Sequence, residues 1–170
     1  MYMDSHMYFI ADIPNICNDF KQRAIDEFLQ HWKSIIYTSR SLILYRNVKV
    51  IFGYESYMDL LPKQLYINIA KLRLSSHHLR IQTARYVQDY IDRRQRYCIF
   101  CNNNEIEDEY HFILECNMYL TIRRKYISRY YYVRPNMYKF CQLLKSTSKR
   151  TLFYLAKYIK EAFDIRNELN

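Results

Sequence analysis

The segment CIFCNNNEIEDEYHFILEC, residues 98–116, decides how the rest of this chain is organised. It places four potential metal ligands in the pattern C-x2-C-x9-H-x4-C, namely Cys98, Cys101, His111 and Cys116. Three thiolates and one imidazole have the number and chemistry of the ligands in a closed tetrahedral zinc site. Four protein ligands leave no position for water or substrate. We therefore expect one Zn²⁺ ion with a structural role.

Two other interpretations of these cysteines stay open. Free cysteines are often buried in ordinary cores, and a histidine beside them can be a core or surface residue. Disulfides are the other alternative. The first residues, MYMDSHMYFIADIP, lack the basic start of a cleavable signal peptide, which favours a reducing compartment. We favour zinc because three of the five cysteines fall within nineteen residues at the spacing of a metal site.

The composition indicates a folded protein and excludes several kinds of site. Half of the 170 residues are apolar and nineteen are tyrosines, which argues against disorder. Gly53 is the single glycine, whereas phosphate-binding loops need several. No apolar run approaches the roughly 18 to 20 residues that span a bilayer. We expect an intracellular protein, nuclear or cytoplasmic, with no membrane partner and no small-molecule substrate.

Hydrophobic periodicity predicts helices along most of the chain. The first covers residues 18–38, with Asn18 or Asp19 as its N-cap. Residues 41–52 are ambiguous between a buried helix and a strand, and a helix is expected over Leu79–Tyr90. The other expected helical stretches are residues 54–61, 62–72, 117–133, 136–145 and 148–169. The apolar face of the first helix is expected in the core and consists of Phe20, Ala24, Phe28, Trp32, Ile35 and Ile36.

These elements predict a mainly α protein, a helical domain with a small CCHC zinc knuckle inserted between two helical halves. The N-terminal helical region covers residues 1–96, and the C-terminal helical region covers residues 118–170. Between them lie residues 97–117, the knuckle segment. We expect all three regions to form one compact unit.

The net charge of +9 is concentrated on both sides of the knuckle segment. Residues 71–96 hold seven basic and two acidic side chains, and residues 116–150 hold nine basic and no acidic ones. Such clusters suit a polyanion, because each neutralised phosphate releases counterions. We therefore expect a nucleic acid, RNA or DNA, as partner. The candidate contacts are Arg80, Arg85, Arg93, Arg94, Arg96, Arg123, Arg124, Lys125 and Arg129.

Tyrosines are interspersed among these cations. Exposed tyrosines can stack on unpaired bases, as they do in proteins that bind single strands. The candidates are Tyr97, Tyr119, Tyr126, Tyr130, Tyr131 and Tyr132. The alternative is a solvated basic face with the tyrosines packed beneath it.

The acidic residues of the knuckle segment also have two interpretations. Glu105, Glu107, Asp108 and Glu109 can cap the helix that carries His111. They can instead imitate the paired carboxylates of a metal-dependent nuclease or polymerase. We favour the cap, because a chain that binds zinc here has little freedom to build a second metal centre. Glu109 and Glu115 are candidates to orient His111 or neighbouring arginines.

The residues described so far resemble a known family. The block RYCIFCNNNEIEDEYHFILECNMYLTIRRKYI, residues 96–127, looks like the zinc knuckle near the C-terminus of reverse transcriptases from non-LTR (LINE-type) retrotransposons. The run KLRLSSHHLRIQTARY, residues 71–86, is similar to the segment that precedes this knuckle, and residues 31–58 resemble the linker before it.

The resemblance implies a non-catalytic fragment of a transposable element. In the family, the endonuclease and polymerase domains lie upstream, and the knuckle region helps to hold template RNA or target DNA. The chain contains neither a tyrosine-x-Asp-Asp polymerase motif nor a set of nuclease carboxylates, so we expect no enzyme activity. Two alternatives remain, a structural or protein-interaction module with a structural zinc ion, and a subunit that supports a separately encoded polymerase.

Overall fold

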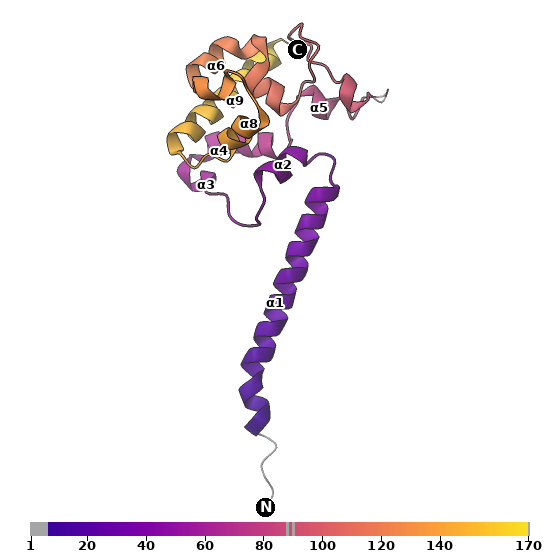
Figure 1. Ribbon diagram of the computed structural model, residues 1–170, viewed down its shortest axis with the longest axis vertical. Coiled ribbons are helices and arrows are strands. Elements are labelled where there is room, and N and C mark those ends of the chain that lie inside the picture. The colour runs from indigo at the N-terminus through magenta and orange to yellow at the C-terminus, as the bar shows by residue number, and fades with distance from the viewer. Residues whose placement is uncertain (1–6, 88, 90, 170) are drawn as a thin grey trace, which may run out of the picture. The chain divides into compact units, whose positions relative to one another are not determined.

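The computed structural model describes residues 7–87, 89 and 91–169 and contains two compact units, Met1–Ser39 and Arg40–Asn170. Most of the described residues are helical, and Figure 1 labels most of the α-helices. Within the described residues, β-structure is limited to an isolated antiparallel bridge between Tyr97 and Ile106. The prediction of a mainly α protein is therefore confirmed.

The first unit contains the helix α1, Met7–Thr38. The helix begins well before the predicted start at residue 18. Asn18 and Asp19 therefore lie inside it and cannot serve as its N-cap. Pro14 also lies inside the helix, where its ring removes one backbone N–H from the hydrogen-bond ladder.

The apolar face of α1 differs from the prediction. Phe20, Phe28 and Ile35 are exposed, whereas Ile36 is buried. The prediction of a core face is therefore wrong for most of its members. Periodicity shows which side chains share one face of a helix, but it does not show whether another element covers that face.

The second unit begins with three short helices. These are α2, Ile43–Val48, α3, Tyr57–Leu60, and α4, Lys63–Arg73. The ambiguous stretch 41–52 thus contains a short helix. Pro62, whose backbone is extended, occupies the N-cap position of α4. The helix buries Leu65, Ile69 and Leu72, which recur at helical spacing.

The helix expected over Leu79–Tyr90 is much shorter in the structure. Only α5, Arg80–Thr83, is α-helical there, and the described residues that follow form turns and bends. Tyr86 and Val87, which belong to the predicted apolar pattern, are exposed. This part of the prediction is wrong, because an amphipathic segment gains stability as a helix mainly by burying its apolar face, and these two side chains stay exposed.

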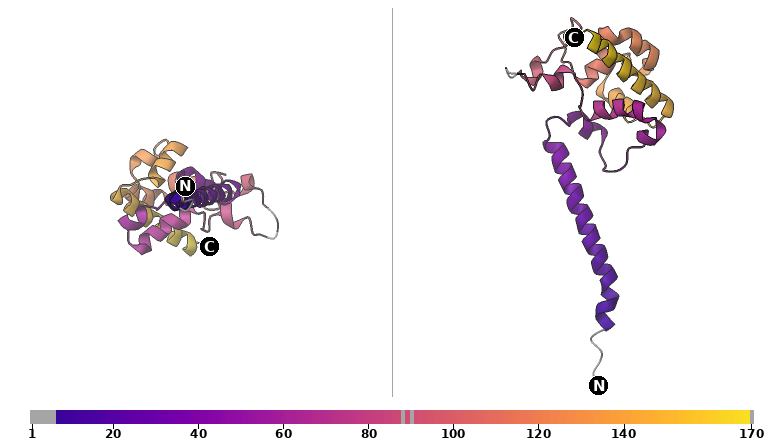
Figure 2. Two further views of the ribbon diagram at one scale, coloured as in Figure 1. Left: turned by 90° about the horizontal axis from the view of Figure 1, so that it is seen from below. Right: turned by 180° about the vertical axis from the view of Figure 1, so that it is seen from behind.

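The described residues after the knuckle segment, 118–169, form four α-helices. They are α6, Leu120–Tyr126, α7, Arg129–Tyr132, α8, Met137–Leu144, and α9, Lys149–Glu168. Ser148 caps α9 by accepting a hydrogen bond from the Thr151 N–H at 3.4 Å. Helices from both sides of the knuckle segment share one core, in which α9 packs against both α4 and α6 (Figure 2).

Candidate metal centre

The four predicted ligands come together in the second unit. One ligand atom from each of Cys98, Cys101, His111 and Cys116 lies within 4.8 Å of all the others. The Sγ atoms of Cys98 and Cys116 are 3.9 Å apart, and Cys101 Sγ lies 3.2 Å from His111 Nε2. In a tetrahedral site with zinc–sulfur bonds of about 2.3 Å, two sulfur atoms are about 3.8 Å apart. The donor set and its spacing therefore fit one metal ion.

A short hairpin positions the first two cysteines. The Cys98 N–H donates to Glu105 O at 2.8 Å, and the Glu107 N–H donates to Arg96 O at 2.9 Å. Asn104 turns the chain between them with a φ of 52°. Asparagine tolerates this left-handed conformation better than most residues with a side chain. The C-x2-C motif is thus held between two paired backbone segments.

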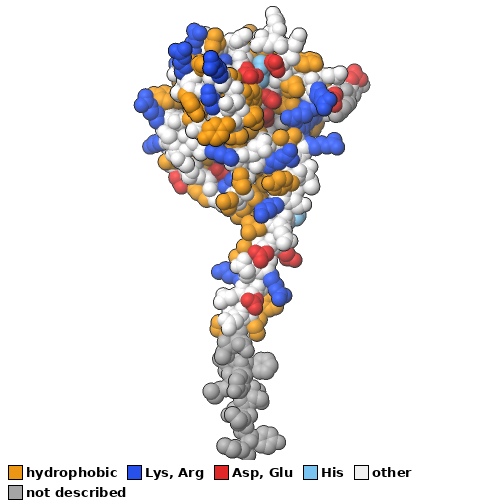
Figure 3. All heavy atoms as spheres, in the orientation of Figure 1, with side chains coloured by type: hydrophobic (Ala, Val, Ile, Leu, Met, Phe, Trp, Pro, Cys, Tyr) orange, Lys and Arg blue, Asp and Glu red, His pale blue; other side chains and the backbone are white. Residues whose placement is uncertain are grey.

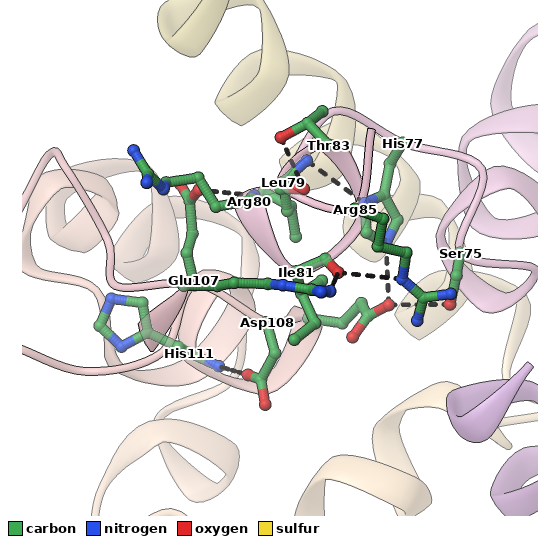
Figure 4. A network of polar contacts seen from close by, with 12 residues as sticks. Ser75, His77, Leu79, Arg80, Ile81, Thr83, Arg85, Glu107, Asp108 and His111 are labelled. Carbon is green, nitrogen blue, oxygen red and sulfur yellow. Dashed lines mark hydrogen bonds and ion pairs between the residues drawn. The ribbon is translucent and has the colours of Figure 1, made fainter. Parts of the chain in front are cut away.

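A wide helical turn positions the other two ligands. This is η2, His111–Glu115, a π-helical turn in which the Cys116 N–H donates to His111 O at 2.8 Å. Asp108 Oδ1 accepts a hydrogen bond from the His111 N–H at 2.9 Å, as Figure 4 shows. The expectation that an acidic residue caps the helix of His111 is thus confirmed for Asp108. Single π-turns often occur at functional sites.

The carbonyl groups of η2 need partners because the helix ends at Glu115. The Tyr158 hydroxyl on α9 donates to Phe112 O at 2.6 Å. Arg123 on α6 donates from Nε to Ile113 O at 2.6 Å and from Nη2 to Cys116 O at 2.8 Å. Both side chains are buried, so these bonds are shielded from water. They join the ligand-bearing turn to α6 and α9.

Glu107 joins the same segment to the end of α9. Its carboxylate accepts hydrogen bonds from the guanidinium of Arg166 and from the Arg80 N–H, and the Arg80 bond is drawn in Figure 4. Burial raises the pKa of Glu107, while Arg80 and Arg166 oppose that effect. The Arg166 guanidinium also lies 4.6 Å from the centre of the Phe100 ring. One buried ion pair thus connects the C-x2-C hairpin to α9.

The two acidic residues proposed to orient His111 have different partners. Glu109 accepts hydrogen bonds from Ser75 at 2.9 Å and from His77 at 2.8 Å, so it does not face His111. Burial raises the pKa of Glu109, but the His77 hydrogen bond and charge outweigh it and lower the pKa overall. Glu115 Oε2 lies 3.7 Å from His111 Nδ1, an ion-pair distance beyond hydrogen-bond reach. Only Glu115 therefore neighbours the ring of the candidate ligand.

The charges of the four ligands depend on one another. Contact with Cys116 lowers the pKa of the Cys98 thiol to about 3, with His111 adding to the effect and burial opposing it. The contact with Cys98 raises the pKa of Cys116, and burial adds to this. Burial lowers the pKa of His111, but the Cys98 thiolate outweighs it and raises the pKa overall. Three thiolates this close repel one another, and a bound cation removes that repulsion.

The predicted nucleic-acid contacts fall into two groups. Arg94, Arg124, Lys125 and Arg129 are exposed, and Arg80, Arg85 and Arg93 are half-buried. Arg96 and Arg123 are buried and donate to backbone carbonyls, Arg96 to those of Ile81 and Ile91. A guanidinium that is buried and bonded in this way cannot reach a phosphate. Arg96 and Arg123 are therefore structural residues, which corrects the prediction for these two.

The predicted stacking tyrosines also differ in exposure. Tyr119 is 1% exposed, and the centre of its ring lies 4.9 Å from the centre of the Phe112 ring. The prediction that Tyr119 stacks on a base is therefore wrong. Tyr97 and Tyr130 are exposed, and Tyr126, Tyr131 and Tyr132 are half-buried.

A cleft of about 530 Å³ lies between α6, α7 and the start of α9. In Figure 3, Lys and Arg side chains gather over the region where Figure 1 labels α6. Arg150 and Tyr154 line this cleft but were not singled out by the sequence, because they lie on a helix whose periodicity indicated only core packing. The full lining is Arg124, Lys125, Tyr126, Ile127, Ser128, Arg129, Tyr131, Tyr132, Leu143, Arg150, Thr151 and Tyr154.

The basic residues before the knuckle segment line a different hollow. It has a volume of about 290 Å³ and is lined by Arg40, Ile43, Arg85, Arg93 and Arg96. Two of these arginines are already engaged, because Arg85 donates to Arg40 O at 2.7 Å and Arg96 donates to carbonyls. Burial lowers the pKa of Arg85, and the charges of Arg96 and Arg93 lower it further.

No family model, curated protein or solved structure matches this chain. The resemblance to the non-LTR retrotransposon knuckle therefore stays a prediction. Among the helices in the described ranges, none combines the length and the apolar character needed to cross a membrane.

Proposed function

We propose that this protein is a non-catalytic, zinc-stabilised module that binds nucleic acid, like the C-terminal knuckle region of the non-LTR reverse transcriptases that its sequence resembles. The proposal rests on one observation: the second unit holds two sets of residues in different places. Four soft ligands are gathered in the interior, and a cleft lined by cations and tyrosines opens on the surface.

The proposed metal is zinc because the donor set contains three sulfur atoms and one imidazole nitrogen. Thiolates and imidazole favour Zn²⁺, whereas Mg²⁺, Ca²⁺ and Mn²⁺ prefer oxygen ligands. In this proposal Cys98 and Cys101 hold the ion from the hairpin, and His111 and Cys116 hold it from η2. The ion thereby stiffens a knuckle that lies between the helices of residues 40–96 and those of residues 118–169.

The proposed ligand is nucleic acid because the exposed cations outnumber the acids near them. The nine basic residues of 116–150 have no acidic residue among them in sequence, and of these only Arg123 is buried. Phosphate binding by such residues releases counterions and weakens steeply as salt rises. Polymerase and endonuclease activities belong to other parts of the family's proteins, so the proposed role is to hold template RNA or target DNA.

A protein-interaction module is the second candidate. The observation in its favour is the apolar side chains that α1 exposes, among them Ile16, Phe20 and Ile25. Affinity at an apolar interface changes little with salt concentration, whereas affinity for phosphate groups falls steeply as salt rises. Salt dependence therefore separates the two candidates.

The test combines metal analysis with a binding series. Protein purified without added zinc is analysed for metal by elemental mass spectrometry, and binding of labelled RNA and DNA is then followed between about 50 and 200 mM salt. One zinc per chain and a steep loss of affinity with salt would support the proposal. Absence of zinc would refute the proposed metal site. Affinity for nucleic acid that does not change with salt would refute the proposed phosphate binding.

A further inference from the structure

The cleft between α6, α7 and α9 combines positive charge with aromatic surface. Its lining contains four cations, Arg124, Lys125, Arg129 and Arg150, and no acidic residue. Lys125 Nζ forms an ion pair with Glu161, 3.2 Å away. In the described part of the chain, no carboxylate pairs with the three arginines. Cations held close together in this way attract an anionic ligand.

The same cleft offers several flat aromatic faces. Tyr126, Tyr131, Tyr132 and Tyr154 all line it. The rings of Tyr126 and Tyr154 have centres 6.3 Å apart and are tilted by 37°. The Tyr126 hydroxyl donates to Glu161 at 2.7 Å, which holds its ring in place. Aromatic faces in a basic groove bind nucleobases by stacking, whatever the sequence.

Cations lie against these aromatic rings. Lys125 Nζ is 4.6 Å from the centre of the Tyr126 ring, and the Arg150 guanidinium carbon is 5.9 Å from the centre of the Tyr154 ring. Within one cleft, a positive group therefore stands beside each of two rings. A nucleotide presents the complementary pair, a phosphate beside a flat base.

We propose, building on the nucleic-acid function above, that this cleft is a binding site for single-stranded nucleic acid, in which Arg129 and Arg150 bind phosphate and Tyr154 stacks on an unpaired base. Its volume of about 530 Å³ is that of a small-ligand site. A duplex hides the faces of its bases inside the stack, so it can use the cations of the cleft but not the tyrosines. Unpaired strands therefore bind more tightly than duplexes of the same length.

The test compares two oligonucleotides and uses the zinc-loaded, full-length chain. Fluorescence anisotropy measures binding of a labelled twelve-nucleotide thymidine strand and of a twelve-base-pair duplex at one salt concentration. Tyr154→Leu should weaken single-strand binding about tenfold, because stacking on one base is lost, and should leave duplex binding unchanged. Tyr154→Phe keeps the ring and should bind the strand like the unmodified chain.

Two further variants serve as controls. Tyr138→Leu removes an exposed tyrosine on α8 that does not line the cleft, and it should change neither affinity. The double variant Arg129→Gln, Arg150→Gln should reduce the slope of log affinity against log salt for single-strand binding. The expected reduction corresponds to the loss of about two phosphate contacts. Circular dichroism and metal content confirm that each variant is folded.

Three outcomes would overturn the inference while leaving the proposed function intact. In the first, Tyr154→Leu binds the strand normally. In the second, the duplex binds as tightly as the strand. In the third, a free mononucleotide competes as well as the strand, which would make the cleft a small-nucleotide site. Failure of the folded chain to bind either oligonucleotide at low salt would instead refute the proposed function itself.

A cross-linking measurement locates the strand independently of any variant. A thymidine strand with one 5-bromodeoxyuridine is irradiated in complex with the protein, and the attached peptide is identified by mass spectrometry. The inference expects attachment at a tyrosine of the cleft. Attachment confined to residues outside it would overturn the inference.

Discussion

Arg166 near the end of α9 donates hydrogen bonds to both carboxylate oxygens of Glu107, although the two residues are 59 positions apart in the sequence. Both side chains are almost fully buried. Glu107 directly follows the residue that pairs with Tyr97 in the hairpin. Packing of the last helix and the position of the hairpin that carries Cys98 and Cys101 are therefore linked.

Replacing one partner of this buried ion pair should lower the stability of the fold. In Arg166→Met, Glu107 stays buried without its partner, so the free energy of unfolding should fall by about 3–5 kcal/mol. Urea unfolding with metal content held equal measures this. Lys160→Met, which breaks the exposed pair with Asp164, is the matched control and should change little. Adding Glu107→Gln to Arg166→Met should restore part of the loss, and a further loss would contradict the explanation.

Loss of a metal ligand should abolish both the metal and cooperative unfolding. Cys98→Ser and His111→Ala each remove one of four ligands, and a structural zinc site contributes folding free energy directly. Elemental analysis and thermal denaturation measure the two effects. Cys141→Ser, which alters a half-buried cysteine outside the cluster, should keep one metal per chain. An equally stable Cys98→Ser variant would show that no metal holds this segment.

The hydrogen bond from Tyr158 should contribute measurably to stability. Tyr158→Phe leaves Phe112 O buried without its donor, which should cost about 1–3 kcal/mol. Chemical denaturation of the purified variant measures the loss. Tyr138→Phe removes the hydroxyl of an exposed tyrosine and should be neutral. Equal stabilities for the two variants would mean that the carbonyl groups of η2 find other partners.

Arg123 and Arg124 are neighbours in the sequence and should behave in opposite ways. Arg123→Gln should lower stability, because the carbonyls of Ile113 and Cys116 lose a buried donor. Arg124→Gln should leave stability unchanged and reduce the slope of the salt dependence of binding by about one phosphate. Thermal melts and binding isotherms at several salt concentrations measure both properties. An Arg124→Gln variant with unchanged binding would remove this residue from the interface.

The second unit should fold without α1. A chain that begins at Arg40 contains the whole metal cluster and the hydrophobic core described for Arg40–Asn170. We expect it to keep one metal per chain and the cooperative transition of the full chain. Calorimetry and elemental analysis test this. A shortened chain that aggregates or loses its metal would show that the core needs α1.

The sequence predicted the features that depend on local spacing. The ligand pattern named four residues whose ligand atoms the structure places within 4.8 Å of one another, because a C-x2-C turn and a helical H-x4-C segment largely fix their own geometry. Periodicity found α4 and α9, whose apolar faces are buried in the common core. It failed over Leu79–Tyr90, where α5 covers only Arg80–Thr83 of the described residues and the side chains of Tyr86 and Val87 are exposed.

Roles that depend on distant partners were not visible in the sequence. Arg96 and Arg123 were counted among the phosphate contacts because charge is assigned by residue type. Their actual partners are carbonyl groups left free where the backbone turns, and only the fold shows these groups. The sequence likewise offers His111, two positions away, or a neighbouring arginine as the partner of Glu109, whereas Glu109 pairs with His77, 32 positions away.

The position of α6 links the interior of the protein to its surface. Arg123 on this helix donates a hydrogen bond to the carbonyl oxygen of Cys116, a candidate ligand. The next two residues of the helix, Arg124 and Lys125, line the cleft. If the ion orders this helix for nucleic acid, thermodynamic reciprocity requires that nucleic acid also strengthens binding of the ion. We therefore expect an oligonucleotide to slow transfer of zinc from this protein to a chelator, so that a bound strand protects its carrier from metal depletion.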